Sequence, residues 1–306
     1  MSQPVLKVQN LTKRYKGYTA VDNISFEIPS GKVIGLLGPN GAGKTTTIQM
    51  LLGITLADKG SICYFGRDFY THRQECLQNI NFASSFNSLQ GKISVIENLK
   101  VFAMLYNIAD ATKKIDRLSE QLELGGLMDD LYHNLSAGQK TRVNIAKALL
   151  NDPKLILMDE PTASLDPDIS DKLLSIIEDL RKESHLSILY TSHDMNEVAR
   201  VCDEVIFLDH GKIIAHDTPL GLTKQIKTAT LKLVFEGERQ KVESYIRESG
   251  ATLVHIDKTR VQLKLPEQQI AEAIFGVSKT GAYITDVEVE KPTLEDFFLH
   301  IARKNT

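Results

Sequence analysis

The stretch Gly38-Pro39-Asn40-Gly41-Ala42-Gly43-Lys44-Thr45 decides the fold of this chain. It has the pattern G-x-x-x-x-G-K-S/T, and it lies between an apolar run at residues 33–37 and a segment with helical character that begins near residue 44. A strand, a turn and a helix in this order are the context that a phosphate-binding loop requires. Glycines let successive backbone N–H groups turn inward, and the helix N-terminus adds its positive dipole end. The sequence therefore predicts an α/β protein with a P-loop that binds a polyphosphate.

The polar residues that close this stretch have expected roles. Lys44 supplies a point charge that reaches the β- and γ-phosphates, and the Thr45 hydroxyl is a candidate Mg²⁺ ligand. Thr46 is a candidate contact for the α-phosphate. A chance match in a turn is the alternative, and the flanking strand and helix disfavour it. The residues expected to surround the nucleotide from the loop itself are Gly38, Pro39, Asn40, Gly41, Ala42 and Gly43.

Composition indicates an ordinary globular protein, and the length is sufficient for two domains. The chain has 306 residues, of which 42% are hydrophobic and 25% charged. Its formal net charge of −3 provides no global attraction to nucleic acid or to an anionic membrane, so no nucleic-acid partner is expected. Three cysteines without a C-x-x-C pair favour reduced, buried thiols and a cytosolic setting. The sequence contains no apolar run near 18 residues, so we expect no membrane-spanning segment in it.

A pair of adjacent acids follows a second buried strand. The apolar run at residues 155–158 ends in Asp159-Glu160-Pro161-Thr162. A carboxylate at the end of a core strand beside a phosphate loop holds Mg²⁺ in nucleotide triphosphatases, which is the role expected of Asp159. Glu160 is one residue closer to bulk water, so we expect it to be the base that polarises the attacking water. A solvated turn is the alternative for such acids.

Two further segments suit phosphate contacts. The strand expected at residues 187–191 ends in Ser192-His193-Asp194, which places His193 where it could reach a γ-phosphate. The stretch Leu135-Ser136-Ala137-Gly138-Gln139 opens a helix, with Ser136 at the N-cap position. A helix-capping serine is usually only a cap, so this second anion site depends on its context.

Tyr15 is the candidate adenine platform. It lies in a segment, residues 11–18, that we interpret as a polar turn between strands expected at residues 5–10 and 24–28. A tyrosine ring stacks on a base without a hydrogen-bond code. The alternative is an ordinary surface or edge-strand aromatic residue, and Tyr18 is the less favoured choice for the platform.

The chain divides by pattern near Lys227. Before it, residues 94–102 predict a helix whose apolar positions Ile96, Leu99, Phe102 and Leu105 share one face. We expect this face to be core, with an exposed partner-docking stripe as the alternative. After Lys227, strands and helices follow in the order β-α-β-β-α-β, which predicts a small ferredoxin-like α+β module. This module has no catalytic motif, and its expected role is regulatory, dimer-stabilising or structural.

Together and in this order, the phosphate loop, residues 135–139, Asp159-Glu160, Ser164-Leu165-Asp166 and His193 resemble the ATP-binding subunit of an ABC transporter. The resemblance covers about residues 4–226. It implies a P-loop ABC ATPase domain at residues 1–227, with a helical signature subdomain at about 86–135 and an accessory domain at 228–306. It also implies Mg-ATP hydrolysis to ADP and phosphate, with Glu160 and His193 as catalytic residues.

The resemblance further implies partners. Subunits of this family pack head to tail, so Ser136, Gly138 and Gln139 would contact the γ-phosphate held by the phosphate loop of a second copy or a related ATPase subunit. Ser164 to Asp166 would link the two sites. Separate transmembrane permease subunits would hold the chain at the cytoplasmic face of the membrane. The segment Pro292-Thr293-Leu294-Glu295-Asp296-Phe297-Phe298 looks like the extension of ATPases that serve ABC-2-type exporters, which favours a drug-like, lipid-linked or polysaccharide cargo.

Two positions depart from the family pattern. Ala137-Gly138 stands where two glycines are usual, and the serine and second glycine remain. Ser85 stands where the family places a glutamine that contacts Mg²⁺ and faces the membrane subunit, with Gln90 several residues later.

Two other functions compete with the interpretation as an exporter subunit. A soluble ABC-type ATPase that remodels DNA or ribosomes is disfavoured because neither a second cassette nor a long coiled coil is visible, and a non-hydrolysing sensor is disfavoured by the acidic pair.

Overall fold

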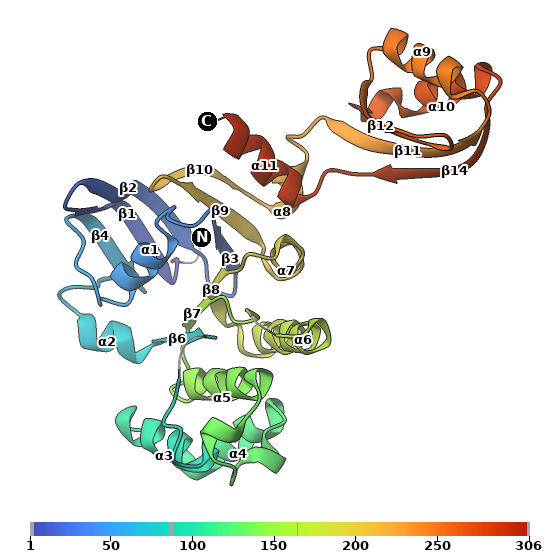
Figure 1. Ribbon diagram of the computed structural model, residues 1–306. Coiled ribbons are helices and arrows are strands. Elements are labelled where there is room, and N and C mark those ends of the chain that lie inside the picture. The colour runs from blue at the N-terminus through green and yellow to red at the C-terminus, as the bar shows by residue number, and fades with distance from the viewer. Residues whose placement is uncertain (1–2, 86–87, 164, 305–306) are drawn as a thin grey trace. The chain divides into compact units, whose positions relative to one another are not determined.

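The computed structural model describes residues 3–85, 88–163 and 165–304, and the chain forms two compact units (Figure 1). The first unit ends at Pro219 and the second begins at Leu220. The sequence pattern places this boundary at Lys227, eight residues later. The short helix α8 (Pro219–Thr223) covers half of these residues, and all of it except Pro219 belongs with the second unit.

A mixed six-stranded sheet forms the centre of the first unit. The strands β9, β3, β8, β7 and β6 are mutually parallel, and β10 pairs antiparallel with β9 at one edge. Parallel strands place all their carboxyl ends at one edge of the sheet, which is where ligands bind in such folds. In spatial order the strands are β10 (Lys212–Asp217), β9 (Glu204–Asp209), β3 (Val33–Leu37), β8 (Ser187–Thr191), β7 (Leu155–Asp159) and β6 (Ile80–Ser84).

An antiparallel sheet packs against one face of this central sheet. Its buried side chains share one hydrophobic cluster with those of β3, β7 and the helix α1 (Lys44–Leu51). Its strands in spatial order are β2 (Tyr18–Ile28), β1 (Leu6–Tyr15), β4 (Lys59–Tyr64) and β5 (Arg67–Asp68). The expected polar turn at residues 11–18 is wrong, because β1 and β2 continue through it as a hairpin. Tyr15 pairs with Tyr18 around a two-residue turn in which Gly17 takes φ 93°.

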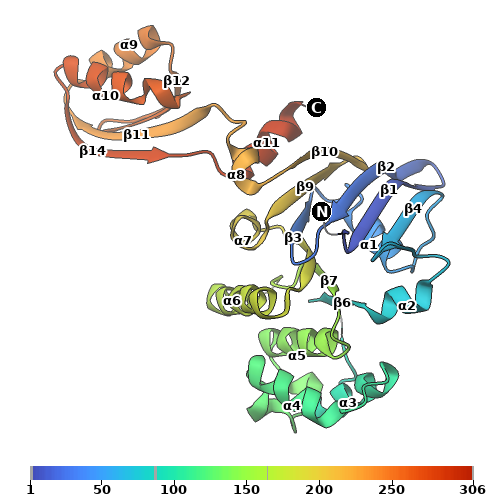
Figure 2. The ribbon, with the colours of Figure 1, turned by 180° about the vertical axis from the view of Figure 1, so that it is seen from behind.

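The helices α3, α4 and α5 gather at one end of the first unit, where α5 packs on β6 (Figures 1 and 2). Each begins with a side-chain cap, and α3 and α5 carry complete capping boxes. Helices α6 and α7 follow β7 and β8. The bounds are α2 (Arg73–Gln78), α3 (Val95–Leu105), α4 (Ala111–Gln121), α5 (Ala137–Leu149), α6 (Pro167–Ser184) and α7 (Met195–Val201), with 3-10 turns at Gly125–Leu127 and Tyr132–Asn134.

The apolar face expected on α3 is only partly core. Leu99 is fully buried, whereas Leu105 is 67% exposed and its neighbour Met104 is 76% exposed. The expectation of a continuous buried face is therefore wrong at the C-terminal end of the helix. Helical periodicity identified the side of the helix that faces its neighbours, but the neighbours end before the last turn.

The second unit has the predicted ferredoxin-like order of elements. Its sheet is antiparallel throughout in the order β12-β13-β11-β14, and α9 and α10 cover one face of it (Figure 1). Alternate residues of β11, such as Leu231 and Phe235, face these helices and are fully buried. The bounds are β11 (Thr228–Glu236), α9 (Arg239–Ser249), β12 (Thr252–Ile256), β13 (Arg260–Pro266), a 3-10 turn at Glu267–Gln269, α10 (Ile270–Lys279), β14 (Tyr283–Glu290) and α11 (Leu294–Lys304).

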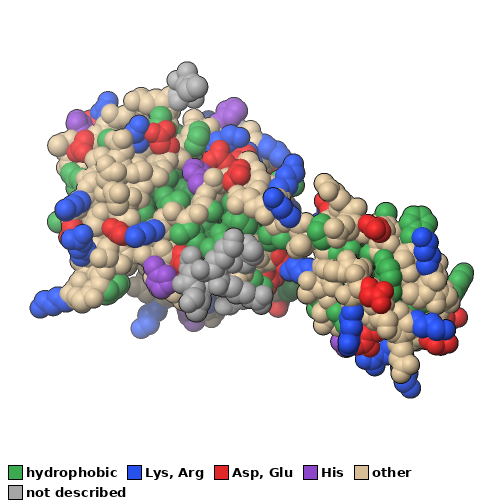
Figure 3. Space-filling model, turned by 90° about the horizontal axis from the view of Figure 1, so that it is seen from above, with side chains coloured by type: hydrophobic (Ala, Val, Ile, Leu, Met, Phe, Trp, Pro, Cys, Tyr) green, Lys and Arg blue, Asp and Glu red, His purple; other side chains and the backbone are tan. Residues whose placement is uncertain are grey.

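Two properties of the surface bear on partners. On the face drawn in Figure 3, basic and acidic side chains are interspersed rather than gathered in one basic stripe. None of the helices in the described part of the chain combines the length and the apolar character needed to cross a bilayer.

Candidate nucleotide site

The phosphate loop connects β3 to α1, as predicted, and its backbone requires glycine at two positions. Gly38 has φ 147°, and a Cβ there would lie 2.2 Å from the Leu208 carbonyl oxygen. Gly43 has φ 105°, and a Cβ there would lie 2.4 Å from the carbonyl oxygen of Ala20. Any larger residue would push the loop away from β9 and β2. The loop is therefore held in one shape by its packing against neighbouring strands.

A cavity of about 570 Å³ opens over this loop. It brings together most of the predicted residues from three separate parts of the sequence. The carboxyl end of β7 supplies the acidic pair, and the hairpin of β1 and β2 supplies an aromatic ring. The lining residues are Tyr18, Ala20, Pro39, Asn40, Gly41, Gly43, Lys44, Thr45, Thr46, Asp159 and Glu160. Gly38 and Ala42 are absent from this lining and instead contribute to the shape of the loop. The Ala42 carbonyl accepts a hydrogen bond from Gly211 N at 3.0 Å.

Lys44 is buried and folds back onto its own loop. Its Nζ donates to the carbonyl oxygens of Gly38 at 2.6 Å and Pro39 at 3.1 Å. Burial lowers the pKa of Lys44, and the carboxylates of Glu160 and Asp159 oppose that shift. The ammonium is thus close to both acids and is satisfied by backbone oxygens that a phosphate group could replace.

Tyr18, rather than Tyr15, lines the cavity. The two rings stack with their centroids 5.7 Å apart, and Lys13 Nζ lies 5.5 Å from the centroid of Tyr15. From the sequence, Tyr15 was the favoured platform and Tyr18 the less favoured one, because this segment was interpreted as a turn rather than as a hairpin. Cross-strand pairing places both rings on the same tip, so the aromatic surface beside the loop consists of two rings.

The acidic pair has a defined geometry at the end of β7. Asp159 Oδ1 accepts a hydrogen bond from Thr191 Oγ1 at 2.6 Å. Glu160 adopts φ 50°, and its backbone N–H reaches both the carbonyl oxygen (3.1 Å) and Oγ1 (3.0 Å) of Thr191. A left-handed conformation at a non-glycine residue stores strain and is common at functional sites. Sequence reasoning missed Thr191, although its place at the end of β8 beside His193 was a signal.

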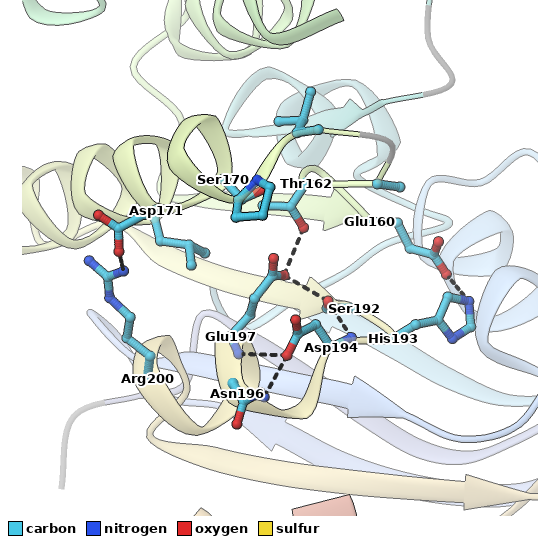
Figure 4. Close-up of a pocket in the computed structure, with 14 residues that line it drawn as sticks. Glu160, Thr162, Ser170, Asp171, Ser192, His193, Asp194, Asn196, Glu197 and Arg200 are labelled. Atoms are coloured by element: carbon cyan, nitrogen blue, oxygen red, sulfur yellow. Dashed lines mark hydrogen bonds and ion pairs between the residues drawn. The ribbon is translucent and has the colours of Figure 1, made fainter.

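His193 contacts Glu160 directly. The Nε2 atom of His193 lies 2.5 Å from Glu160 Oε1, and Figure 4 shows the two side chains pointing toward each other. The imidazole is largely exposed, whereas the carboxylate is mostly covered. An imidazole that carries its proton on Nε2 donates it to this oxygen. The arrangement can therefore hold a carboxylate next to the phosphate loop and move a proton at its outer oxygen.

Ser136, Gly138 and Gln139 lie at the start of α5 and are absent from the described residues that line the cavity. Ser136 is the N-cap, as predicted. Its Oγ accepts from Gln139 N at 3.3 Å, and its own N–H donates to Gln139 Oε1 at 2.8 Å. Gly138 packs so closely that a Cβ would lie 2.5 Å from Ile169 Cγ2. One copy of the chain therefore does not bring its phosphate loop and its signature residues together.

Ser85, which the sequence also singled out, is absent from the described residues that line this cavity. Ser85 directly follows β6, and its buried Oγ has no hydrogen-bond partner among the described residues. Ser164 lies outside the residues that the structure describes.

The donor set suits Mg²⁺ bound together with a nucleotide. Thr45 and Asp159 both line the cavity and offer one hydroxyl and one carboxylate. No cluster of three or more His, Cys, Asp or Glu side chains suited to a metal occurs in residues 3–85, 88–163 and 165–304. Mg²⁺ is commonly held by one or two protein oxygens plus substrate phosphates, which matches this pair.

Comparison with known proteins adds a family relationship. Residues 21–163 match the family described as "ABC transporter". The "Nod factor export ATP-binding protein I" of Ralstonia nicotianae is 38% identical over 71% of this chain and 68% of its own length. The "Linearmycin resistance ATP-binding protein LnrL" of Bacillus subtilis is 31% identical over 97% of this chain and 98% of its own. A solved structure of cbiO1 from Clostridium perfringens superposes with a TM-score of 0.67 at 28% identity, over 73% of this chain and 92% of that one.

Proposed function

Since the chain belongs to the ABC transporter family and is an ATP-hydrolysing subunit of an exporter, we propose that its phosphate loop and acidic pair form half of a shared Mg-ATP site. The observation that carries this proposal is the cavity of about 570 Å³ in which Lys44 and the acidic pair face one another. The export function favours this reading over a soluble ATPase that remodels DNA or ribosomes. A subunit that hydrolyses ATP is likewise not a sensor that only binds nucleotide.

The residues of this chain divide the work of hydrolysis. Lys44 exchanges the loop carbonyls for the β- and γ-phosphates, and the loop N–H groups bind the remaining phosphate oxygens. Thr45 and Asp159 would hold Mg²⁺, which would supply positive charge that neutralises the phosphate oxygens. Glu160 orients the attacking water and accepts its proton. His193 holds the Glu160 carboxylate from the solvent side and contacts the γ-phosphate when the site closes.

A second subunit completes the site. The signature residues at the start of α5 present a helix N-terminus that is suited to an anion, and in one copy they lie away from the cavity. Head-to-tail pairing with a second copy, or with a related ATPase subunit, places Ser136, Gly138 and Gln139 against the γ-phosphate. Nucleotide binding then shifts the pair from open to closed, and hydrolysis reopens it.

We also propose that separate transmembrane permease subunits hold the chain at the cytoplasmic face of the membrane. The exposed apolar side chains of Met104 and Leu105 on α3 support a partner surface near the helical end of the first unit. The resemblance of the C-terminal extension favours a drug-like, lipid-linked or polysaccharide cargo.

Purification from native membranes tests this assignment. The tagged chain is extracted with a mild detergent, and the co-purifying proteins are identified and quantified by mass spectrometry. We expect a polytopic membrane protein in roughly one-to-one ratio with the chain. Recovery with ribosomes, with DNA or with no partner would contradict the permease assignment while leaving the ATPase chemistry intact.

A further inference from the structure

A buried carboxylate lines the same cavity as the Glu160 and His193 pair and contacts the segments that carry both residues. Glu197 projects from α7 into the base of a second cavity of about 480 Å³, which Glu160 and His193 also line (Figure 4). Its side chain is almost completely buried. A buried carboxylate requires hydrogen-bond donors, because an ionised group loses its hydration there.

Three hydroxyl groups satisfy a single oxygen of this carboxylate. Glu197 Oε2 accepts from Thr162 Oγ1 at 2.7 Å, from Ser192 Oγ at 2.8 Å and from Tyr190 OH at 3.0 Å. All three donors are buried. Hydrogen bonds to an ionised acceptor are stronger than those between neutral groups. The carboxylate therefore fixes three hydroxyls from two different strand ends at one point.

The position of these donors along the chain gives the contact its significance. Thr162 lies two residues after Glu160, in a turn closed by the hydrogen bond from Ala163 N to the Glu160 carbonyl at 3.1 Å. Ser192 directly precedes His193. One carboxylate oxygen thus joins the turn that carries the base to the residue before the histidine. Displacing either segment by about 1 Å would misalign the pair, and such misplacement is costly in catalysis.

We propose that Glu197 is a positioning residue for ATP hydrolysis, which sets the placement of Glu160 relative to His193 through Thr162 and Ser192. This inference rests on the proposed role of Glu160. It concerns turnover alone, because Glu197 makes no hydrogen bond to the phosphate loop among the described residues.

Variants of Glu197 separate positioning from folding. For Glu197→Ala we expect kcat to fall at least tenfold, and for Glu197→Gln by a smaller factor, because the amide oxygen still accepts hydrogen bonds. The dissociation constant of a fluorescent ATP analogue, measured with folded protein, should stay within twofold. Asn196→Ala, at an exposed neighbouring position on the same helix, is the matched control and should keep kcat within twofold.

Donor variants keep the test decisive if Glu197→Ala does not fold. Thr162→Val and Ser192→Ala each remove one donor, and each should lower kcat at least threefold without changing nucleotide affinity. The double variant Glu197→Gln/Ser192→Ala should be no slower than the product of the single effects and closer to the slower single variant, because Glu197→Gln weakens the same contact that Ser192→Ala removes.

Three results would overturn the inference. They are an unchanged kcat in Glu197→Gln, Thr162→Val and Ser192→Ala, a loss of nucleotide affinity in proportion to kcat, or full hydrolysis by Glu160→Gln. Full hydrolysis by Glu160→Gln would also remove the proposed role of Glu160. An unchanged kcat in the other three variants, together with an inactive Glu160→Gln, would reject the positioning role of Glu197 alone.

Discussion

The Nε2 atom of His193 lies 2.5 Å from Oε1 of Glu160, so the ends of β8 and β7 are joined by a contact between two side chains. If Glu160 is the general base, Glu160→Gln removes the proton acceptor while keeping the size of the side chain. We expect turnover to fall by a factor of about 10² to 10⁴. Phosphate release measures this loss, and size-exclusion chromatography with ATP should still detect a dimer. Glu120→Gln, an exposed site on α4, is the control, and undiminished hydrolysis by Glu160→Gln would exclude the base role.

Lys44 should control nucleotide binding itself. Lys44→Ala removes the only ammonium that lines the cavity within the described part of the chain. A charge-assisted hydrogen bond contributes about 1.5–3 kcal/mol, so affinity for ATP should fall by about tenfold or more. Equilibrium binding of a fluorescent ATP analogue measures this loss. Unchanged affinity would show that Lys44 remains on the loop carbonyls when nucleotide binds.

The two stacked tyrosines should share the base platform. Tyr15→Ala and Tyr18→Ala should each weaken ATP binding, whereas Tyr15→Phe and Tyr18→Phe should retain it, because stacking uses the face of the ring. Stacking of a base on an aromatic ring contributes about 1–3 kcal/mol. Titration with ATP and with inorganic triphosphate distinguishes the effect, since triphosphate lacks a base. Equal losses for both ligands would argue for a change in the loop and against a platform.

Local motifs predicted much of this site. Three features depend on residues that are neighbours in sequence: the phosphate loop, the acidic pair and the Ser136 cap. Each can therefore be identified from the residue types at a few consecutive positions. Thr191 and Glu197 were not identified, because their roles arise only when β7 lies beside β8 and α7 folds back over both strand ends. A sequence without an alignment does not give the order of strands in a sheet.

The hairpin and α3 show a related limit. The tip of the hairpin is exposed, so residues 11–18 show no alternation of apolar and polar residues that would predict a strand. Strand β1 continues to Tyr15 because it pairs with β2. The apolar face of α3 was predicted from its period, but a period does not show where the covering elements end. Leu105 lies beyond that point.

Lys147 on α5 should make stability depend on pH. Its Nζ donates to the Phe82 carbonyl at 3.0 Å, and burial lowers the pKa of Lys147 from 10.5 to about 8. Between pH 8 and 10.5 the unfolded chain binds more protons at this site than the folded chain, so the free energy of unfolding rises with pH. The cost of burying the charge is fully present below pH 8.

The comparison of Lys147→Met with wild type isolates this contribution. Between pH 7.5 and 9.5, the free energy of unfolding of wild type should rise relative to the variant by about 2 kcal/mol. Urea unfolding at the two pH values measures the difference. Lys113→Met, at an exposed position on α4, should show no such relative change. A relative fall of wild-type stability would contradict the sign of the pKa shift.

Met104 and Leu105 should affect the permease and leave the nucleotide site unchanged. Both side chains are largely exposed on α3, and neither lines the nucleotide cavity. Met104→Ser/Leu105→Ser removes apolar surface that a membrane subunit would cover, so less permease should co-purify with the tagged chain, by several-fold. Basal phosphate release from the purified chain should stay within twofold. The reason is that these substitutions change the surface that binds the permease and leave the contacts of Asp159 and Glu160 in place.

Phe275→Ser is the matched control for this surface, because Phe275 is 69% exposed but belongs to the second unit. It should leave the permease ratio unchanged. If Phe275→Ser instead removes the permease while the α3 variant retains it, the docking surface lies on the C-terminal module. That module would then be part of the coupling to transport, and α3 would carry its exposed side chains for another partner.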